Sequence, residues 1–170
     1  MAYDIETFNK EFVRIMKSIN IYIWCNKKQI PKYFNFYVNE RKCKFDIICW
    51  HLTNALPTYS NKYLSDTEYC LHFFKGKGKT FPKSYIDAQT FYISPKNQND
   101  KKLYKHPTIK PLDLTRKLIR NSSEVGDIVF DPFMGSGTTG VACKLENRNF
   151  IGCELLKKYY DVAVERINNI

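Results

Sequence analysis

The sequence of 170 residues contains no apolar run longer than a single strand. Its most apolar stretches, residues 21–25 and 45–50, are far too short to cross a bilayer, which takes about 20 apolar residues. The first residues have neither a basic start nor an apolar stretch, so no secretory signal is visible. We therefore expect a cytoplasmic protein without a membrane partner.

Patterns typical of metal sites and disulfide scaffolds are also missing. No two of the six cysteines have Cys-x-x-Cys spacing, and the histidines His51, His72 and His106 form no ligand cluster with them. These spacings predict no metal site. Without a visible leader, the cysteines are expected to be reduced, buried thiols.

Acidic residues are scarce compared with basic ones. The 17 Asp and Glu stand against 27 Lys and Arg, which gives a formal net charge of +10. Such a surplus favours a polyanionic partner, because basic side chains that neutralise phosphates release condensed counterions. Charge alone does not separate DNA from RNA or from an acidic membrane surface. With 44% hydrophobic and 26% charged residues, the chain is expected to form one globular domain.

Apolar periodicity predicts alternating helices and strands along most of the chain. The expected helices cover residues 6–16, 31–40, 111–120, 137–145 and 157–168. The expected strands cover residues 19–25, 45–50, 68–74, 127–130 and 150–153. Strand–helix–strand–helix order in the last third is typical of a parallel sheet with right-handed crossovers, so the sequence predicts an α/β fold.

A lysine-rich stretch, residues 75–105, interrupts this alternation. It contains eight lysines against two aspartates, together with Phe81, Tyr85, Phe91, Tyr92 and Tyr104. Basic residues interleaved with aromatics suit contacts with phosphates and exposed bases. A solvated loop whose aromatics pack back onto the domain explains the same composition, and composition favours neither interpretation.

The most informative segment runs from Ile128 to Gly140. A buried strand ends in Asp131, and a glycine turn then opens a helix. Glycines allow positive φ and close approach of the backbone, and a helix start offers unpaired N–H groups. A second acid, Glu154, ends the next strand, where carboxylates hydrogen-bond ribose hydroxyls. Together these groups favour a ligand that joins an amino-acid zwitterion to a nucleoside.

Two other interpretations of the glycine turn stay open on its letters alone. Residues 135–140 match G-x-G-x-x-G, the dinucleotide fingerprint, but that match is weak by itself. A tight strand–helix turn without any ligand also explains them. A phosphate-binding P-loop is excluded, because no Gly-Lys-Ser/Thr follows.

The wider context favours one family. D-P-F-x-G-S-G-T-T at residues 131–139, followed by I-G-x-E at 151–154 and preceded by H-P-x-x-K-P at 106–111, resembles the DNA amino-methyltransferases of the β arrangement. These enzymes methylate the exocyclic amine of adenine or cytosine, and the three elements occur here in the family's order. Residues 50–73 resemble an upstream family stretch, although Leu52 stands where the family often has Lys. The resemblance covers roughly residues 5–167.

The resemblance implies a Rossmann-like fold of S-adenosylmethionine-dependent methyltransferases, with a mostly parallel sheet and an antiparallel hairpin. It divides a single domain into a partial catalytic half (1–74), a target-recognition region (75–105) and a cofactor-binding half (106–170). It assigns contacts with S-adenosylmethionine to Thr108, Lys110, Asp131, Phe133, Gly135, Ser136, Gly137 and Thr138, and the ribose to Glu154. Lys110 as an ordinary surface lysine and Phe133 as a core residue are the plain alternatives.

The resemblance also implies double-stranded DNA as the partner, as in a restriction–modification system. The expected DNA contacts are Lys75, Lys77, Lys79, Lys83, Lys101 and Lys102. At about thirty residues the region 75–105 is short for reading a specific base sequence.

One element of the family is missing. The family binds the target amine with Asp/Asn/Ser-Pro-Pro-Tyr/Phe/Trp, whose polar groups accept the amine's hydrogens while the aromatic stacks on the flipped base. The sequence contains no such tetrapeptide, since residues 131–133 belong to the glycine turn and residues 56–59 lack the acid and the second proline. We therefore assign no catalytic residue and expect a truncated or split form that is inactive alone.

In the family the tetrapeptide ends a central strand, which lies between the strand ending at Asp131 and the strand at 21–25. Without it, backbone groups would face a gap that folded domains rarely tolerate. Three outcomes are open: the two strands pair directly, a second chain or second copy supplies the strand, or the fold is only partly stable.

Two other classes of function compete with this hypothesis. A non-catalytic DNA-binding module with a vestigial cofactor pocket gives the lysine-rich stretch the main role. A nicotinamide-dependent oxidoreductase rests on the glycine spacing alone and ranks far below, because it explains neither residues 106–111 nor residues 50–73.

Overall fold

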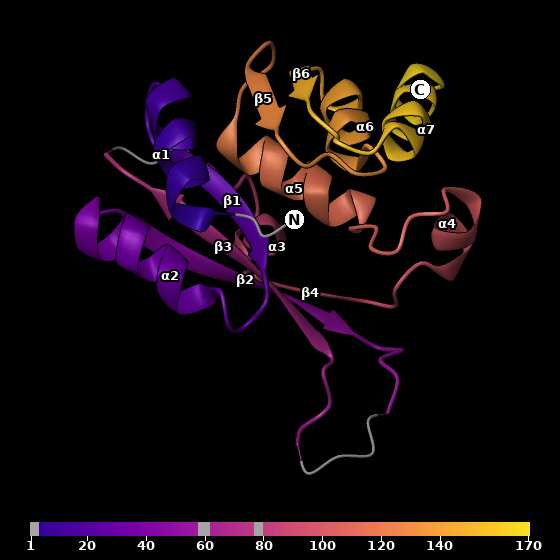
Figure 1. Ribbon diagram of the computed structural model, residues 1–170, viewed down its shortest axis with the longest axis horizontal. Coiled ribbons are helices and arrows are strands. Elements are labelled where there is room, and N and C mark those ends of the chain that lie inside the picture. The colour runs from indigo at the N-terminus through magenta and orange to yellow at the C-terminus, as the bar shows by residue number, and fades with distance from the viewer. Residues whose placement is uncertain (1–3, 58–61, 77–79) are drawn as a thin grey trace. The chain divides into compact units, whose positions relative to one another are not determined.

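The computed structural model describes residues 4–57, 62–76 and 80–170 (Figure 1). The chain divides into two compact units. The first comprises Met1–Lys79 and Gln89–Pro95, and the second comprises Thr80–Ala88 and Lys96–Ile170. Among the helices of the described residues, none has the length and apolar character that a bilayer crossing requires.

The first unit is built on a four-stranded mixed sheet with the order β1-β3-β2-β4. Its strands are β1 (Asn20–Cys25), β2 (Lys44–Leu52), β3 (Thr67–Phe74) and β4 (Phe91–Ser94). Both β1 and β2 pair antiparallel with β3, and β2 pairs parallel with β4. The helices are α1 (Ile5–Ile15), α2 (Ile30–Phe34) and the π-helix η1 (Asn35–Glu40), so the single helix expected at 31–40 is two segments.

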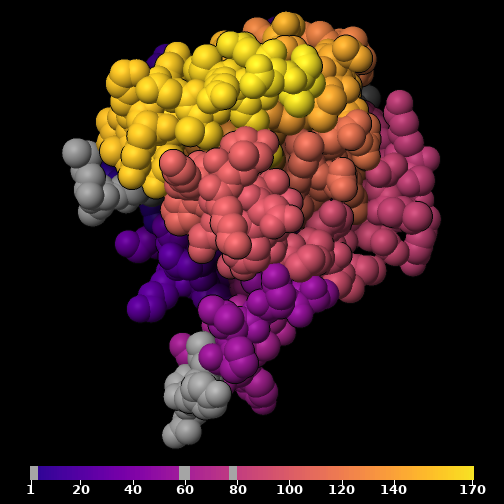
Figure 2. Space-filling view, turned by 90° about the vertical axis from the view of Figure 1, so that its right-hand side faces the viewer, coloured from indigo at the N-terminus to yellow at the C-terminus, as the bar shows by residue number. Residues whose placement is uncertain are grey.

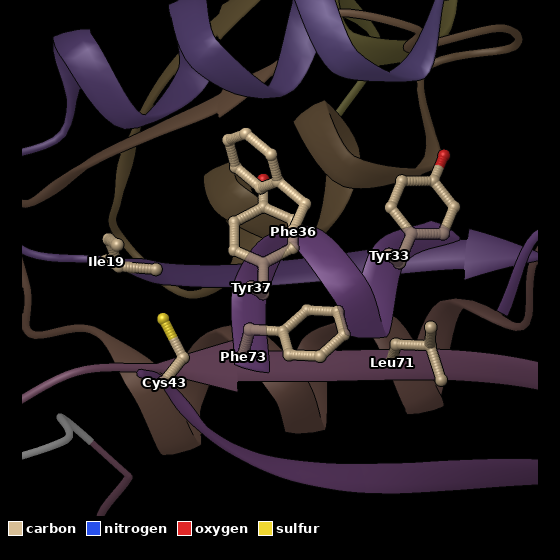
Figure 3. Close-up of a cluster of buried hydrophobic side chains, with 7 residues drawn as sticks. All are labelled: Ile19, Tyr33, Phe36, Tyr37, Cys43, Leu71 and Phe73. Atoms are coloured by element: carbon tan, nitrogen blue, oxygen red, sulfur yellow. The ribbon is translucent and has the colours of Figure 1, made fainter. Parts of the chain in front are cut away.

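The core of the first unit lies between η1 and the sheet, as the close-up in Figure 3 shows. Its buried members are Ile19, Tyr33, Phe36, Tyr37, Cys43, Leu71 and Phe73. Tyr37 stacks on Phe73 with ring centroids 4.7 Å apart, and both side chains are fully buried. The Tyr37 hydroxyl donates a hydrogen bond to Asn9 Oδ1 at 3.1 Å, which ties α1 to this aromatic core.

The second unit contains the predicted strand–helix–strand crossover. Parallel strands β5 (Ile128–Asp131) and β6 (Asn149–Gly152) are joined by α6 (Thr138–Leu145). The helices α5 (Leu112–Ser122) and α7 (Lys157–Asn168) both pack against α6 (Figure 1). Arg116 and Arg120 of α5 bind the buried Glu146 carboxylate with N–O distances of 2.6 and 2.9 Å, which ties α5 to the end of α6.

The lysine-rich stretch 75–105 is more structured than the loop expected from its composition. It contains α3 (Tyr85–Ala88), β4 and α4 (Gln98–Leu103), of which β4 belongs to the first unit and both helices to the second. Its aromatics divide as well. Phe81, Tyr85 and Phe91 are exposed, whereas Tyr92 and Tyr104 are half-buried, so packing back onto the protein holds for two of the five.

The strands β1 and β5, between which the family's tetrapeptide strand was expected, belong to two different sheets. In the part of the chain that the structure describes, β1 pairs with β3 alone and β5 with β6 alone, so each lies at the edge of its own sheet. The edge strand β5 also carries the exposed apolar side chains Ile128 and Phe130.

Candidate cofactor-binding site

Two glycines in the left-handed region shape the turn between β5 and α6. Gly135 has a φ of +53° and Gly137 a φ of +79°. A Cβ atom added at Gly135 would lie 2.9 Å from Nε2 of His106, and one added at Gly137 would lie 2.9 Å from Cβ of Ala163 on α7. Both positions therefore require glycine, because the backbone angle and the close neighbour each exclude a larger residue.

Asp131, the last residue of β5, holds the two ends of this turn together. Its Oδ1 accepts a hydrogen bond from the Phe133 N–H at 3.0 Å, and its Oδ2 accepts one from the Thr139 hydroxyl at 2.6 Å. Burial raises the pKa of the Asp131 carboxyl above its ordinary value. The two hydrogen bonds oppose this pKa shift, and the negative charge of Glu154 adds to it.

Glu154 joins the end of the neighbouring strand to the same turn. Its Oε2 accepts a hydrogen bond from the Gly135 N–H at 3.1 Å, and its Oε1 accepts one from the Leu156 N–H at 2.9 Å. The parallel register pairs Asp131 with Gly152, and the Cys153 N–H donates to the Asp131 carbonyl at 3.0 Å. The two acids therefore lie at the carboxyl ends of the β5–β6 pair, one on each side of the glycine turn.

His106 connects the preceding motif to this turn. Its ring packs against Gly135 and meets the Tyr159 ring of α7 edge-on with centroids 4.5 Å apart. Its Nδ1 lies 2.9 Å from the carbonyl oxygen of Thr108, and burial lowers the pKa of His106 below its ordinary value. The imidazole ring thus packs the 106–110 segment against the glycine turn.

All nine cofactor residues predicted from the sequence lie in the second unit. Ser136, Gly137 and Thr138 are buried, Lys110 is half-buried, and Thr108 and Phe133 are exposed. Sequence reasoning missed three residues that contact this turn, His106, Thr139 and Arg166, and also Tyr159, whose ring contacts His106. His106 was within reach, because it opens the H-P-x-x-K-P motif. Thr139 was also within reach, because it ends the D-P-F-x-G-S-G-T-T motif, whereas Tyr159 and Arg166 carry no signal of their own in the sequence.

The six predicted DNA-contacting lysines are distributed over the chain's two units. Lys75 belongs to the first unit, whereas Lys83, Lys101 and Lys102 are exposed residues of the second. Figure 2 faces the side on which α4 lies and shows this segment at the surface. Lys77 and Lys79 lie outside the described residues.

The chain is similar to known methyltransferases along most of its length. A family model for N6/N4 methyltransferases, with the description DNA methylase, matches residues 4–165. The type II methyltransferase M.HinfI of Haemophilus influenzae is 30% identical over 184 residues, which cover 97% of this chain and 51% of M.HinfI. The type II methyltransferase M2.DpnII of Streptococcus pneumoniae is 32% identical over 178 residues, which cover 94% of this chain and 66% of M2.DpnII.

Solved structures give the same result for the fold. The crystal structure of the M1.HpyAVI–SAM complex matches with a TM-score of 0.79 and 34% identity, covering 98% of this chain and 85% of M1.HpyAVI. The fold and the glycine turn between two acid-ended strands thus define an α/β protein of the methyltransferase class. Within that class, the chain belongs to the N6/N4 DNA methylase family. It spans about half to two thirds of the length of the two curated relatives.

Substitution of Gly137 by alanine tests the geometry of the turn, and Gly126 provides a matched control. Both residues have similar positive φ values, but a Cβ at Gly126 meets nothing within 4 Å. Gly126→Ala is expected to lower the free energy of unfolding by about 1–2 kcal/mol, the strain of a left-handed residue. Gly137→Ala is expected to lower it by about 1–3 kcal/mol more, because α7 must move to admit the methyl group. Equal losses in denaturant unfolding would contradict the tight contact with α7.

Proposed function

We propose that this chain binds S-adenosylmethionine as the cofactor-binding part of a site-specific DNA methyltransferase. The observation that carries the proposal is the arrangement of Asp131 and Glu154 at the ends of neighbouring parallel strands, on either side of one glycine turn. Membership of the DNA methylase family supports it, as does a fold shared with a protein solved in complex with SAM.

The chemistry of the site fits this ligand, which carries an ammonium, a carboxylate, a sulfonium and ribose hydroxyls. Asp131 is a buried anion that forms no ion pair within the described part of the chain, so a cationic group bound beside it would be stabilised. Glu154 ends β6, where a carboxylate can accept hydrogen bonds from ribose hydroxyls. When bound, the cofactor supplies the electrophilic methyl group.

The remaining contacts are assigned around the same turn. The His106 ring packs against Gly135, which brings the 106–110 segment to the turn. Thr108 and Lys110 are therefore assigned to the methionine end of the cofactor, together with the turn residues Gly135, Ser136, Gly137 and Thr138. The Phe133 side chain is 55% exposed, and we assign it to the cofactor rather than to core packing.

Double-stranded DNA is the proposed partner, and the region 75–105 is its proposed contact surface. The contacts are assigned to Lys75, Lys77, Lys79, Lys83, Lys101 and Lys102. The exposed rings of Phe81, Tyr85 and Phe91 lie between these lysines in sequence, which suits contacts with bases as well as phosphates. In this division of labour, residues 106–170 bind the cofactor and residues 1–74 form a partial catalytic half.

The 170 residues alone are proposed to bind the cofactor without transferring its methyl group. They contain no tetrapeptide that could accept the hydrogens of an exocyclic amine and stack on a flipped base. Because β1 and β5 each lie at the edge of a sheet, a strand carrying that tetrapeptide has an edge with which to pair. A second chain is the proposed source of a strand with the tetrapeptide. A second copy of this chain could supply only a pairing strand, because its sequence has no such tetrapeptide.

A DNA-binding module with a vestigial cofactor pocket is the second candidate. The net charge of +10 and the exposed lysines of α4 favour it. Two results together would favour this candidate over the cofactor-binding proposal. The Glu154→Ala chain would keep full DNA affinity, and the unsubstituted chain would bind no cofactor.

Calorimetry with S-adenosylmethionine and S-adenosylhomocysteine tests the cofactor site. We expect binding by the unsubstituted chain, and at least about tenfold weaker binding after Asp131→Asn or Glu154→Gln, because each change removes a charged acceptor. Asp161→Asn removes the same charge from an exposed position on α7 and serves as the matched control. Absence of heat with both ligands, on folded protein, would reject the proposal.

The same binding is expected to depend on pH through Asp131. Burial raises the pKa of the free carboxyl, whereas a bound ammonium group favours its ionised form and lowers that pKa. Affinity is therefore full above the raised pKa and falls as the pH drops through it. The Asp131→Asn chain should lack this part of the pH dependence.

Methyl transfer to unmethylated DNA, followed with labelled cofactor, is expected to stay at background for the 170 residues alone. Addition of a polypeptide that contains an apolar strand ending in Asp-Pro-Pro-Tyr is expected to produce transfer. The mixture with Asp131→Asn in place of the unsubstituted chain controls for transfer that does not use this site. Time-dependent incorporation by the unsubstituted chain alone would show that the missing tetrapeptide is dispensable.

Removal of two lysines from α4 tests the proposed DNA surface. Lys101→Gln/Lys102→Gln is expected to weaken DNA binding and to reduce the slope of log affinity against log salt by about 0.9 for each phosphate that is no longer neutralised. Lys17→Gln/Lys28→Gln changes the net charge equally at exposed positions of the first unit. If both double variants weaken binding to the same extent, net charge alone attracts DNA and the region 75–105 has no special role.

A further inference from the structure

Arg166, in the last turn of α7, is a buried cation beneath the glycine turn. The residue is only 8% exposed. The guanidinium Nη1 donates to the Thr138 hydroxyl at 3.0 Å, to the Ser136 carbonyl at 3.3 Å and to the Ser136 hydroxyl at 3.4 Å. One nitrogen thus contacts the residues immediately before and after Gly137, and so it fixes the backbone of the turn.

The other contact of this guanidinium is an aromatic ring. The Arg166 Cζ atom lies 4.3 Å from the centroid of the Tyr104 ring, a distance suited to a cation–π interaction. Tyr104 stands two residues before His106, whose ring packs against Gly135. Arg166 therefore joins α7, the glycine turn and the segment that leads into His106. A planar guanidinium can stack and donate at once, which a lysine ammonium cannot reproduce.

The partners of Arg166 are all neutral. Among the ion pairs of residues 4–57, 62–76 and 80–170, none includes Arg166, and its acceptors are two hydroxyls and a carbonyl. A buried cation without a carboxylate keeps an uncompensated charge in a medium of low dielectric constant. Ser136 and Thr138 point their hydroxyls towards that charge. An anionic group bound on the turn would therefore be stabilised by it.

We propose that Arg166 is a positioning residue that makes the glycine turn selective for ligands carrying an amino-acid end, whose carboxylate its charge favours. This inference rests on the proposed binding of S-adenosylmethionine. Arg166 acts through Ser136 and Thr138 and is not itself a catalytic residue. The ring of Tyr104 contacts the guanidinium, so Tyr104 contributes to the same selectivity.

Two ligands separate this role from general support of the fold. S-Adenosylhomocysteine carries the amino-acid end, whereas 5′-methylthioadenosine keeps the nucleoside and the thioether but lacks the amino and carboxyl groups. Arg166→Met is expected to weaken S-adenosylhomocysteine by about tenfold or more, as for a hydrogen-bonded charge, and methylthioadenosine by less than about threefold. Arg166→Lys, which keeps the charge without the stacking, should fall between Arg166→Met and the unsubstituted chain.

Arg148 provides the matched control, because it is a half-buried arginine of the same unit. It binds Ser123, with Nε–Oγ and Nη2–O distances of 3.1 and 2.7 Å, and makes none of the contacts described for the turn. Arg148→Met is expected to lower the free energy of unfolding while the affinity ratio of the two ligands stays unchanged. Tyr104→Leu leaves Arg166 itself in place. Like Arg166→Met, it is expected to reduce the ratio of the affinity for S-adenosylhomocysteine to the affinity for methylthioadenosine.

The outcomes separate this inference from the proposed function. Equal weakening of both ligands in Arg166→Lys and Tyr104→Leu, measured on folded protein, would overturn the positioning role and leave cofactor binding intact. Variants that bind both ligands as tightly as the unsubstituted chain would overturn it as well. If the unsubstituted chain binds neither ligand, the proposed function fails and the inference fails with it. Should Arg166→Met not fold, Arg166→Lys and Tyr104→Leu still decide the question.

Discussion

The parallel pairing of β5 with β6 is the constraint on which the candidate site depends. Its register sets Asp131 opposite Gly152, so that Glu154, two residues further on, reaches the backbone of Gly135. A shift of one residue would turn the side chains of β6 to the other face and take Glu154 away from the turn. The covalent connection through α6 then fixes the glycine turn between the two strand ends.

The charge of Glu154 adds to the cost of ionising Asp131, and the hydrogen bond from the Phe133 N–H offsets part of that cost. N–H groups of Phe133, Gly135 and Leu156 donate to the two carboxylates, and Glu154 still raises the pKa of Asp131. The same unit buries the cation Arg166 without a carboxylate partner. Negative and positive charges are thus held apart around one turn. A zwitterion can satisfy both, which a neutral nucleoside cannot.

The sequence predicted the elements that local patterns determine. The bounds expected for α7 agree with the structure, and the five predicted strands occur within one or two residues of their expected positions, because apolar periodicity and glycine turns mark them. The short strand β4 was not predictable, since its four residues are held by pairing with β2 and by the Trp50 indole, which donates to Ser94 at 2.9 Å. Arg166 looks like an ordinary basic residue in a last helical turn, and only tertiary packing shows that it is buried.

The proposed function assigns cofactor binding and recognition of the target amine to different strands. The contacts described for the glycine turn, from His106 to Arg166, are made between residues of the second unit. Recognition of an exocyclic amine needs an acceptor and an aromatic on a further strand, and β5 lies at the edge of its sheet where such a strand could pair. A cofactor held without a target base has no nucleophile to receive its methyl group. In the proposed division of roles, loss of an acceptor strand would therefore affect methyl transfer before it affects the contacts of the glycine turn.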